Sequence, residues 1–238
     1  MDKPRSKLSC SNIVFFTGAG MSAESGVPTY RGRGGIWNEY KWEEYACESA
    51  FRLNPDLVLD FHELRRIEAL KCKPHEGHVI IKKIQDTVHH TTIITQNIDG
   101  MHQRANSSDV LELHGSLWKM RCESEGIIYE DLDNGKYSSR FCDCGNILRP
   151  DIIWFQDMLN EKVVQEAIRI ISSCDLFVSI GTSAVVYPAA GFPSVAKDSG
   201  AYCIEINPEK TELSHIYNEA IREKASIGLE VLKKQITD

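Results

Sequence analysis

The 238-residue sequence has no long apolar run, and no stretch approaches about 20 uninterrupted apolar residues. We therefore expect no membrane-spanning segment. An excess of basic residues is also missing, because 27 Lys and Arg stand against 34 Asp and Glu, a net charge of −7. This balance argues against nucleic acid as the main partner, since phosphate binding needs a basic stripe. No apolar segment follows residues 1–7, so a secretory leader is not expected either.

The chain contains eight cysteines, but few of them lie close enough in the sequence to form a pair of the kind that binds metal. They are spread over a chain that is too long for a small disulfide scaffold, so reduced thiols in a cytoplasmic enzyme are the expectation. The apolar fraction of 42% is enough for a sizeable core. The charged fraction of 26% and the aromatic fraction of 8% are ordinary for a globular protein and exclude disorder for the bulk of the chain.

Short, continuous apolar runs alternate with stretches of helical spacing. Runs of this kind are typical of parallel strands that are covered on both faces, and the alternation predicts a Rossmann-like, doubly wound α/β sheet. We expect strands at 12–17, 91–95, 175–181 and 201–207, and helices at 56–70, 75–85, 161–171 and 212–221.

Two segments do not fit this alternation. Residues 31–73 are helical but follow no strand directly, and residues 119–150 are polar, irregular and contain Gly and Cys. We interpret both as insertions that form a small lobe within one domain over 1–238. The large lobe then consists of 1–30, 74–118 and 151–238, with a cleft between the lobes. The helix at 56–70 is expected to bury a stripe that contains Leu57, Phe61 and Leu64.

The first expected strand runs directly into Gly18-Ala19-Gly20-Met21-Ser22-Ala23. This hexapeptide fits the G-x-G-x-x-G/A pattern, in which glycines allow a tight turn and a close approach of a pyrophosphate. A glycine-rich turn in any other α/β protein is the alternative. Gly26 and Pro28 would break the following helix at once, which disfavours an ordinary dehydrogenase.

Polar residues follow the second expected strand, where ligands bind in open α/β sheets. Asn97 and Asp99 could hold a ribose, an amide or a water, although both are also good helix-capping residues. His114 ends another short apolar segment and could act as a general base, with a structural histidine as the alternative.

Taken together, these motifs resemble the sirtuins, which are NAD-dependent protein-lysine deacylases. The resemblance rests on 18–31, on Thr95-Gln96-Asn97-Ile98-Asp99, on His114-Gly115, on Gly181-Thr182-Ser183 and on Ile206-Asn207-Pro208. The matches occur in family order and span nearly the whole chain.

The resemblance implies a sirtuin-type catalytic domain that consumes NAD and acts on acylated lysines of protein substrates. It implies that Asn97 and Asp99 face the nicotinamide ribose, that His114 is the general base, and that the products are free lysine, nicotinamide and an O-acyl-ADP-ribose. The implied NAD-binding residues are Gly18, Ala19, Gly20, Ser22, Glu24, Pro28, Tyr30, Arg31, Trp37, Gln96, Asn97, Ile98, Asp99, Gly181, Thr182, Ser183, Asn207 and Ala225.

Within the family, 30–37 and 61–66 are most similar to the branch that removes succinyl and malonyl groups. That branch has a tyrosine and, three residues later, an arginine in its acyl pocket. Here Arg65 matches the arginine, but His62 replaces the tyrosine, and Arg33 is a further basic candidate. His62 could add a hydrogen bond when protonated or weaken the site. A solvated helix face at Arg65 and Arg66, and plain deacetylation, stay open.

Sirtuins usually hold a structural zinc with two Cys pairs. This chain has only Cys122, Cys142 and Cys144 in that region, and tetrahedral zinc would need a fourth ligand from outside this set, such as a carboxylate. The alternative is a small lobe that folds without metal, with Leu148 and 152–153 packing in its place.

The segment with Ile153, Trp154 and Phe155 resembles the one that pairs with the substrate backbone, and core packing is the alternative for its two aromatic residues. Protein mono-ADP-ribosylation and a non-catalytic NAD-binding module remain the competing functions. The sequence sets no oligomeric state.

Overall fold

The fold is that of a computed structural model, which describes residues 8, 10–30, 35–132, 135–183 and 185–237. Its larger part is a six-stranded, fully parallel sheet with the order β3-β2-β1-β7-β8-β9. The strands are β1 (Asn12–Thr17), β2 (His90–Thr95), β3 (Val110–Glu112), β7 (Leu176–Ile180), β8 (Tyr202–Ile206) and β9 (Glu219–Ile221). This arrangement confirms the predicted Rossmann-like class.

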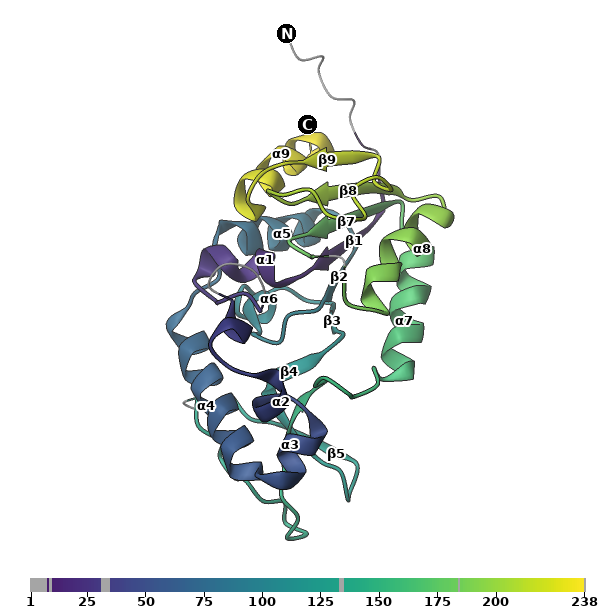
Figure 1. The fold of residues 1–238 in the computed structure, drawn as a ribbon. Helices are drawn as coiled ribbons and strands as arrows, with labels where there is room; N and C mark the ends of the chain where they lie inside the picture. Colours follow the sequence, from purple (N-terminus) through teal and green to yellow (C-terminus); the bar gives the residue numbers. More distant parts are fainter. Residues whose placement is uncertain (1–7, 9, 31–34, 133–134, 184, 238) are drawn as a thin grey trace.

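Helices cover both faces of this sheet, as the continuous apolar strands require (Figure 1). Along β1, Ile13 and Phe15 pack in the core cluster that includes α5 and α9, while Val14 and Phe16 pack in the cluster that includes α7 and α8. These helices are α5 (Glu76–Thr87), α7 (Glu161–Ser172), α8 (Phe192–Asp198) and α9 (Ala225–Thr237).

The sheet reverses direction of winding between β1 and β7, because the chain passes from β1 to one side and from β7 to the other. Where two neighbouring parallel strands lead to opposite sides in this way, a crevice forms beyond their carboxyl ends, and ligands bind in such crevices. The glycine loop begins at the end of β1 and Gly181 lies at the end of β7, so the topology places both segments at this crevice. Three short helical segments, α1 (Ala19–Ser22), η1 (Ala23–Ser25) and α6 (Met101–Arg104), lie just beyond the strand ends.

The small lobe lies at the opposite end of the molecule from α9 (Figure 1). It contains a three-stranded antiparallel sheet with the order β5-β4-β6 and the helical segments that precede the second strand of the large sheet. These elements are β4 (Gly115–Cys122), β5 (Ile127–Glu130), β6 (Arg149–Ile152), η2 (Ile36–Asn38), α2 (Trp42–Tyr45), α3 (Glu48–Leu53) and α4 (Pro55–Lys71). The exact division of the chain between the lobes stays a prediction.

The buried face of α4 differs from the expected stripe. Leu57 and Leu64 are exposed, and the buried side chains include Phe61, His62 and Arg66. The helix itself was predicted correctly, but the side of the helix that faces the core was not, because a charged residue was not expected on the buried face. Arg66 is buried because it reaches the Asp131 carboxylate at 3.3 Å and lies over two aromatic rings, those of Trp118 and Tyr137.

Two other expectations were wrong. Residues 212–221 form turns and β9 instead of a helix, and the polar segment 119–150 contributes strands to the small sheet. In the first case, Asn218 and Glu205 hold the turns: Asn218 accepts the backbone N–H of Cys203 at 2.8 Å, and Glu205 accepts hydroxyl donors from Thr211 and Ser214. Such side-chain bonds compete with a helix, although the apolar spacing favoured one.

None of the helices in the described part of the chain combines the length and apolar character that crossing a bilayer requires.

Candidate active site

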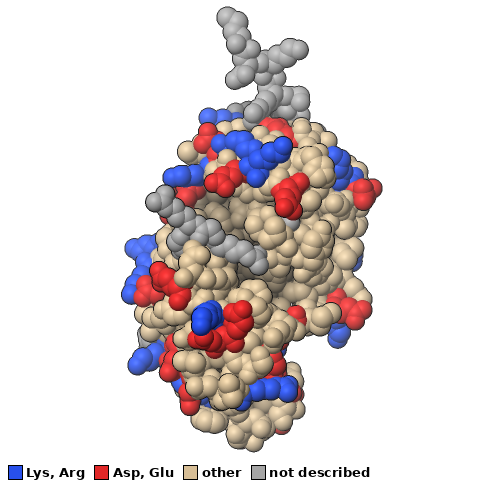
Figure 2. Space-filling model, viewed as in Figure 1, with Lys and Arg blue, Asp and Glu red and all other residues tan. Residues whose placement is uncertain are grey.

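A cavity of about 1050 Å³ lies between the two lobes and is lined by both. One part, which we call the glycine-loop half, is lined by strand-end residues of the large lobe: Gly18, Ala19, Gly20, Gln96, Asn97, Gly181, Thr182, Ser183, Asn207 and Ala225. The other part, the aromatic half, is lined by Tyr30, Trp37, Phe61, His62, Arg65, Ile153, Trp154 and Phe155. On the face drawn in Figure 2, charges of both signs are interspersed on both lobes, and the surface between the lobes is mostly uncharged.

In the glycine-loop half, two backbone segments touch. The N–H of Gly18 donates to Ile180 O at 2.9 Å, and the N–H of Gly20 donates to Gly181 O at 2.8 Å. A Cβ on Gly20 would lie 2.7 Å from the Cα of Gly181, closer than carbon atoms tolerate. The two glycines of the loop are therefore required for this approach. Their own N–H groups are already donated within the protein.

Asn97 joins the loop after β2 to the glycine loop. Its amide nitrogen donates to Gly18 O at 2.9 Å and lies 3.2 Å from the Ser22 hydroxyl, and its backbone N–H donates to the Thr95 hydroxyl at 3.0 Å. Gln96 makes a parallel contact, donating to the Thr182 hydroxyl at 3.1 Å. Asn97 is 5% exposed and lines the cavity, so its position is set from three sides.

Asp99, Ser22 and Pro28 line a small cavity that adjoins the main one, not the main cavity itself. Asp99 accepts the backbone N–H of Met101, the first residue of α6, at 2.9 Å, but the N-cap position itself is Gly100. Burial raises the pKa of the Asp99 carboxyl, and its hydrogen bonds with Met101 and Ser22 act in the opposite direction. Ile98 lines both cavities.

His114 is held at the junction of the two halves. Its Nδ1 lies 3.0 Å from Gln96 O, so Nδ1 carries the proton and Nε2 is left as the basic nitrogen. Burial lowers the pKa of His114 below 6.5, which makes the neutral ring the resting form at pH 7. The next residue, Gly115, has a φ of +74°, and a Cβ there would meet Asp151 O. Its backbone therefore turns the His114 ring into the cavity wall.

The far end of the glycine-loop half is closed by side-chain contacts between large-lobe segments. Asn207 donates to Thr182 O at 3.0 Å. Glu24 accepts both the N–H and the hydroxyl of Ser226 at the start of α9, and these bonds lower the pKa of Glu24 against the effect of burial. Ala225 is buried and lines the cavity next to them.

In the aromatic half, rings from several segments contact one another. The Trp37 ring lies 5.9 Å from that of Tyr30, 6.2 Å from Phe61 and 5.7 Å from Phe155. The guanidinium of Arg65 lies 5.5 Å from the centre of the Tyr30 ring and forms no ion pair within 4.0 Å among the described residues, although its positive charge acts to lower the pKa of the Asp99 carboxyl. Arg31 and Arg33 lie outside those residues.

His62 is buried in this wall and is neutral. Trp154 Nε1–H donates to His62 Nε2 at 2.7 Å. Burial, with the positive charges of Arg65 and Arg149, lowers the pKa of His62 to about 3. A protonated His62, one of the two roles considered from the sequence, is therefore not supported. Trp154 is 4% exposed and belongs to the small-lobe core, although it also lines the cavity.

Behind Trp154 lies a buried cation that the sequence did not reveal. The guanidinium of Arg149 lies 3.8 Å from the centre of the Trp154 ring, and carboxylates of Glu48 and Asp157 each contact it at 2.6 Å. Arg149 is 2% exposed. An arginine in a polar segment gives no sign of burial, so only the spatial convergence of distant acidic residues identifies it.

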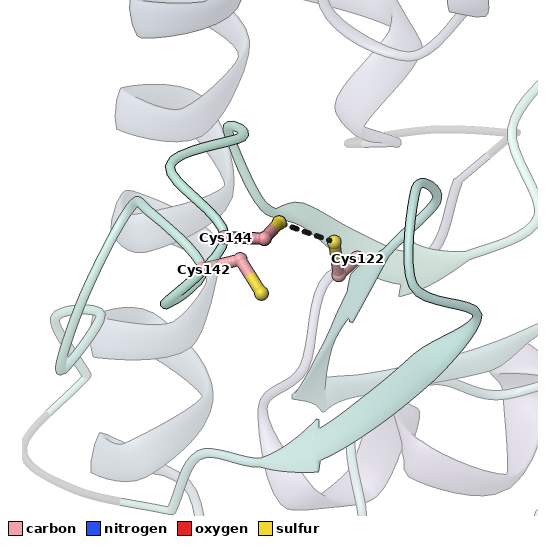
Figure 3. A group of neighbouring side chains, drawn as sticks. All are labelled: Cys122, Cys142 and Cys144. Carbon is pink, nitrogen blue, oxygen red and sulfur yellow. Dashed lines mark hydrogen bonds between the residues drawn. The ribbon is translucent and has the colours of Figure 1, made fainter.

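The three sulfur atoms of Cys122, Cys142 and Cys144 lie within 4.8 Å of one another, at the end of β4 and in the loop before β6 (Figure 3). The sulfurs of Cys122 and Cys144 are 3.6 Å apart. The hydroxyl of Tyr129 contacts the Cys142 sulfur at 3.3 Å and lowers the pKa of that thiol to about 7. Three converging thiols, one of them easily ionised, fit zinc with one position left for another ligand.

A network of buried hydroxyl groups, which the sequence did not predict, lies behind the site. The Thr17 hydroxyl donates to the Thr95 hydroxyl at 2.8 Å and lies 3.1 Å from His102 Nε2, and Thr95 in turn accepts the N–H of Asn97. All these side chains are buried. Threonines that end two otherwise apolar neighbouring strands were the available signal.

These features define a Rossmann-like protein with an inserted small lobe and a dinucleotide-sized cavity between them. The sequence profile of the Sir2 family matches residues 18–188. An NAD-dependent protein deacylase of Aquifex aeolicus is 45% identical over 220 residues, which are 92% of each chain. A solved Sir2 homologue bound to ADP-ribose superimposes with a TM-score of 0.90 at 38% identity, over 95% of this chain and 92% of the other. A Sir2 complex with a deacetylated p53 peptide and 3'-O-acetyl-ADP-ribose has a TM-score of 0.83 at 28% identity, over 96% and 95%.

The chain belongs to the Sir2 family, as the resemblance to the sirtuins predicted.

Proposed function

We propose that this protein is an NAD-dependent protein-lysine deacylase that transfers the acyl group of a modified lysine to ADP-ribose. The observation that carries the proposal is the position of His114, with a free Nε2, between a glycine loop and an aromatic wall in one cavity. The name of the A. aeolicus relative and the ligands of the two Sir2 structures support it.

In the first step, NAD lies in the glycine-loop half with its pyrophosphate beside Gly18 and Gly20. The acyl oxygen of the lysine amide attacks the ribose carbon, and the bond from that carbon to nicotinamide breaks. Cationic character develops on the sugar as the pyridinium leaves. Asn97, already fixed by its bonds to Gly18 and Thr95, and Asp99 supply preorganised dipoles and charge near that centre.

In the second step, His114 Nε2 accepts a proton from a ribose hydroxyl, whose oxygen then attacks the acyl carbon. The lysine nitrogen takes up a proton and leaves as the amine. A water molecule then adds to the acyl carbon, the bond between that carbon and its original oxygen breaks, and the acyl group remains on the ribose hydroxyl oxygen while the original oxygen stays on the ribose carbon as a hydroxyl. The bond from Nδ1 to Gln96 O holds the tautomer that this step requires. The products are nicotinamide, unmodified lysine and an O-acyl-ADP-ribose.

We further propose that acyl groups with a terminal carboxylate are accepted together with acetyl. Arg65 lines the aromatic half and has no carboxylate partner among the described residues, and a guanidinium fork suits a carboxylate. Ile153 and Phe155, which extend from β6, provide the strand on which the peptide pairs. The backbone of Ile153 is already joined to His114, donating to its carbonyl at 2.9 Å.

A panel of acetyl-, malonyl- and succinyl-lysine peptides with NAD, read by mass spectrometry, tests the function. We expect O-acyl-ADP-ribose in equal amount to the freed lysine. Arg65→Met is expected to lower desuccinylation by about 10- to 100-fold, far more than deacetylation, because one charged hydrogen-bonding partner is lost. Arg169→Met, on the exposed side of α7, is the matched control. If the protein substrate becomes ADP-ribosylated and no O-acyl-ADP-ribose forms, the result favours mono-ADP-ribosylation. If no nicotinamide is released, the result favours a non-catalytic NAD-binding module.

Zinc, if bound, would be held by Cys122, Cys142 and Cys144, tying the end of β4 to the loop before β6 and stabilising the small lobe. It would take no part in the acyl transfer, which occurs in the cavity between the lobes. A cytoplasmic location stays a prediction from the sequence.

A further inference from the structure

A chain of three buried hydrogen bonds runs behind the cavity, from α6 to the turn after β2. His102 Nε2 lies 3.1 Å from the Thr17 hydroxyl, and the Thr17 hydroxyl donates to the Thr95 hydroxyl at 2.8 Å. The Thr95 hydroxyl also accepts the backbone N–H of Asn97 at 3.0 Å. None of the four residues is more than 5% exposed, so the loss of one partner would leave a buried polar group unsatisfied.

The donors and acceptors of this chain have one consistent direction. Because the proton of the Thr17 hydroxyl goes to Thr95, Thr17 can only accept from His102, and His102 Nε2 must carry a ring proton. Burial and the neighbouring His75 lower the pKa of His102 to about 3, so the ring is neutral and its Nδ1 is unprotonated. Thr95 therefore accepts hydrogen bonds from two sides, one from Thr17 and one from Asn97.

The turn that Thr95 holds carries groups for both chemical steps. The carbonyl oxygen of Gln96 lies 3.0 Å from His114 Nδ1 and sets the tautomer of that ring. The next residue, Asn97, donates its side-chain amide to Gly18 O at 2.9 Å. The bond from the Asn97 N–H to the hydroxyl two residues earlier restrains the backbone between them. Displacement of the Thr95 hydroxyl would therefore shift the Gln96 carbonyl and the Asn97 side chain together.

We propose that His102 and Thr17 are positioning residues for both nicotinamide release and acyl transfer, because they orient the Thr95 hydroxyl and thereby hold this turn. The inference rests on the proposed deacylase function. Neither His102 nor Thr17 lines the main cavity or the small one beside it, so both act through the turn and not by contact with a substrate.

The direction of the chain can be measured in the wild-type protein. Nitrogen-15 spectra of the histidine rings at pH 7, with His102 assigned through its backbone signals, should show Nε2 protonated and Nδ1 unprotonated. This measurement needs no substitution and no activity, so it can be read even if the proposed function fails. An unprotonated Nε2 would overturn the proposal, since His102 could then not donate to Thr17.

Amide hydrogen exchange tests whether the chain holds the turn. Thr17→Val has nearly the same shape but no hydroxyl, and we expect the Asn97 N–H to exchange about tenfold faster, the usual equivalent of one hydrogen bond. Thr17→Ser restores the hydroxyl and should exchange as the wild type does. Thr91→Val is the matched control, because Thr91 is also buried but its hydroxyl donates to Val88 O, away from the turn. Equal acceleration in Thr17→Val and Thr91→Val would mean a general loss of stability and would refute the proposal.

The pH profile gives a readout that a merely structural role would not move. Burial lowers the pKa of His114, the Gln96 carbonyl raises it, and no carboxylate or cation of the described residues contributes. If the carbonyl moves away in Thr17→Val, the pKa of His114 falls further. The acid limb of kcat/KM for an acetyl-lysine peptide should therefore move to lower pH in Thr17→Val and stay at its wild-type position in Thr17→Ser and Thr91→Val. An unmoved limb in Thr17→Val would contradict the proposal.

A double variant tests whether His102 acts through Thr17. We expect kcat for nicotinamide release to fall about tenfold in Thr17→Val and in His102→Phe, and to fall no further when both substitutions are combined. Independent losses that multiply in the double variant would refute the proposed chain. A wild-type protein that releases no nicotinamide from NAD would instead refute the deacylase function, and the spectra and exchange rates would still decide whether the chain holds the turn.

Discussion

In the glycine-loop half of the cavity, backbone atoms of two loops that follow strands pack against each other. A side chain at Gly20, even a methyl group, would push these loops apart. In the aromatic half, the fit depends on side chains that come from distant segments, including Arg149, Trp154 and His62. The contact between the two loops is thus made by backbone atoms, at positions that the glycine spacing marks in the sequence, and the aromatic half is built by side chains whose positions no local pattern marks.

This difference has a consequence for specificity. A backbone site tolerates few changes and suits a co-substrate that never varies. A side-chain site can change its chemistry by one substitution while the fold is retained, as with His62 in a position where the branch it resembles has tyrosine. We therefore expect variants in the two halves to differ in kind: general loss of turnover in the first, altered selectivity or stability in the second.

The largest effect is expected at His114, where the halves meet. His114→Asn keeps an N–H that can reach Gln96 O but removes the base, and acyl transfer should fall by about 10²- to 10⁴-fold for every acyl group. In the wild type, only the neutral ring can accept a proton, and burial lowers its pKa. The acid limb of kcat/KM should therefore lie below pH 6.5. A limb above pH 6.5, or an active His114→Asn, would contradict the assignment.

The next effect is expected in the aromatic half. Arg149→Met would remove the buried cation that Glu48 and Asp157 both contact, leaving Glu48 with the exposed Arg52 and Asp157 with Arg121 at 4.0 Å. Removing one partner of a buried charge cluster typically costs about 3–5 kcal/mol of unfolding free energy. Urea denaturation measures this loss. The control Arg169→Met removes an exposed pair with Glu166 and should cost under about 1 kcal/mol. Equal losses of unfolding free energy in the two variants would show that Arg149 contributes no more to stability than an exposed arginine.

The same contrast explains how much the sequence could predict. The strand at 12–17 and the loop that follows it were predicted correctly, because apolar periodicity and glycine spacing are local signals. The helix expected at 212–221, the inner face of α4 and the role of Arg149 depend on partners far along the chain. Charged residues such as Arg66 become buried only because Asp131, 65 positions away, neutralises them. No local pattern contains that information.

A moderate effect is expected at the contact between the two loops. The added methyl group of Gly20→Ala would collide with the backbone of Gly181, and a shift of about 1 Å in the loop lowers turnover by about 100-fold. Gly191→Ala is the matched control, since a Cβ there meets nothing within 4 Å. NAD titration by calorimetry should show weakened binding in the first variant only. If Gly20→Ala binds NAD normally, the close approach is not required.

The smallest effect concerns a stack of histidine rings, of which His75 contacts Met21 O in the glycine loop at 2.6 Å. The rings of His75, His78 and His102 stack in sequence, and His78 is fully buried with neither ring nitrogen hydrogen-bonded. Burial lowers the pKa of His78 to about 2. The unfolded chain binds a proton at this residue below about pH 6.5 and the folded chain does not, so stability is complete above that pH and falls as the pH decreases.

From pH 7 to pH 5, this single residue should account for about 2 kcal/mol of lost unfolding free energy. His78→Phe removes the titrating group without breaking a hydrogen bond, so its stability should decline less steeply toward acid by that amount. His89→Phe, at an exposed position, should decline like the wild type. Urea unfolding at the two pH values compares the three proteins, and identical declines would mean that the histidine stack is already protonated or hydrated in the folded state. A flatter curve for His78→Phe alone would show that even the backbone-built half depends on one neutral, buried group of side chains for its acid stability.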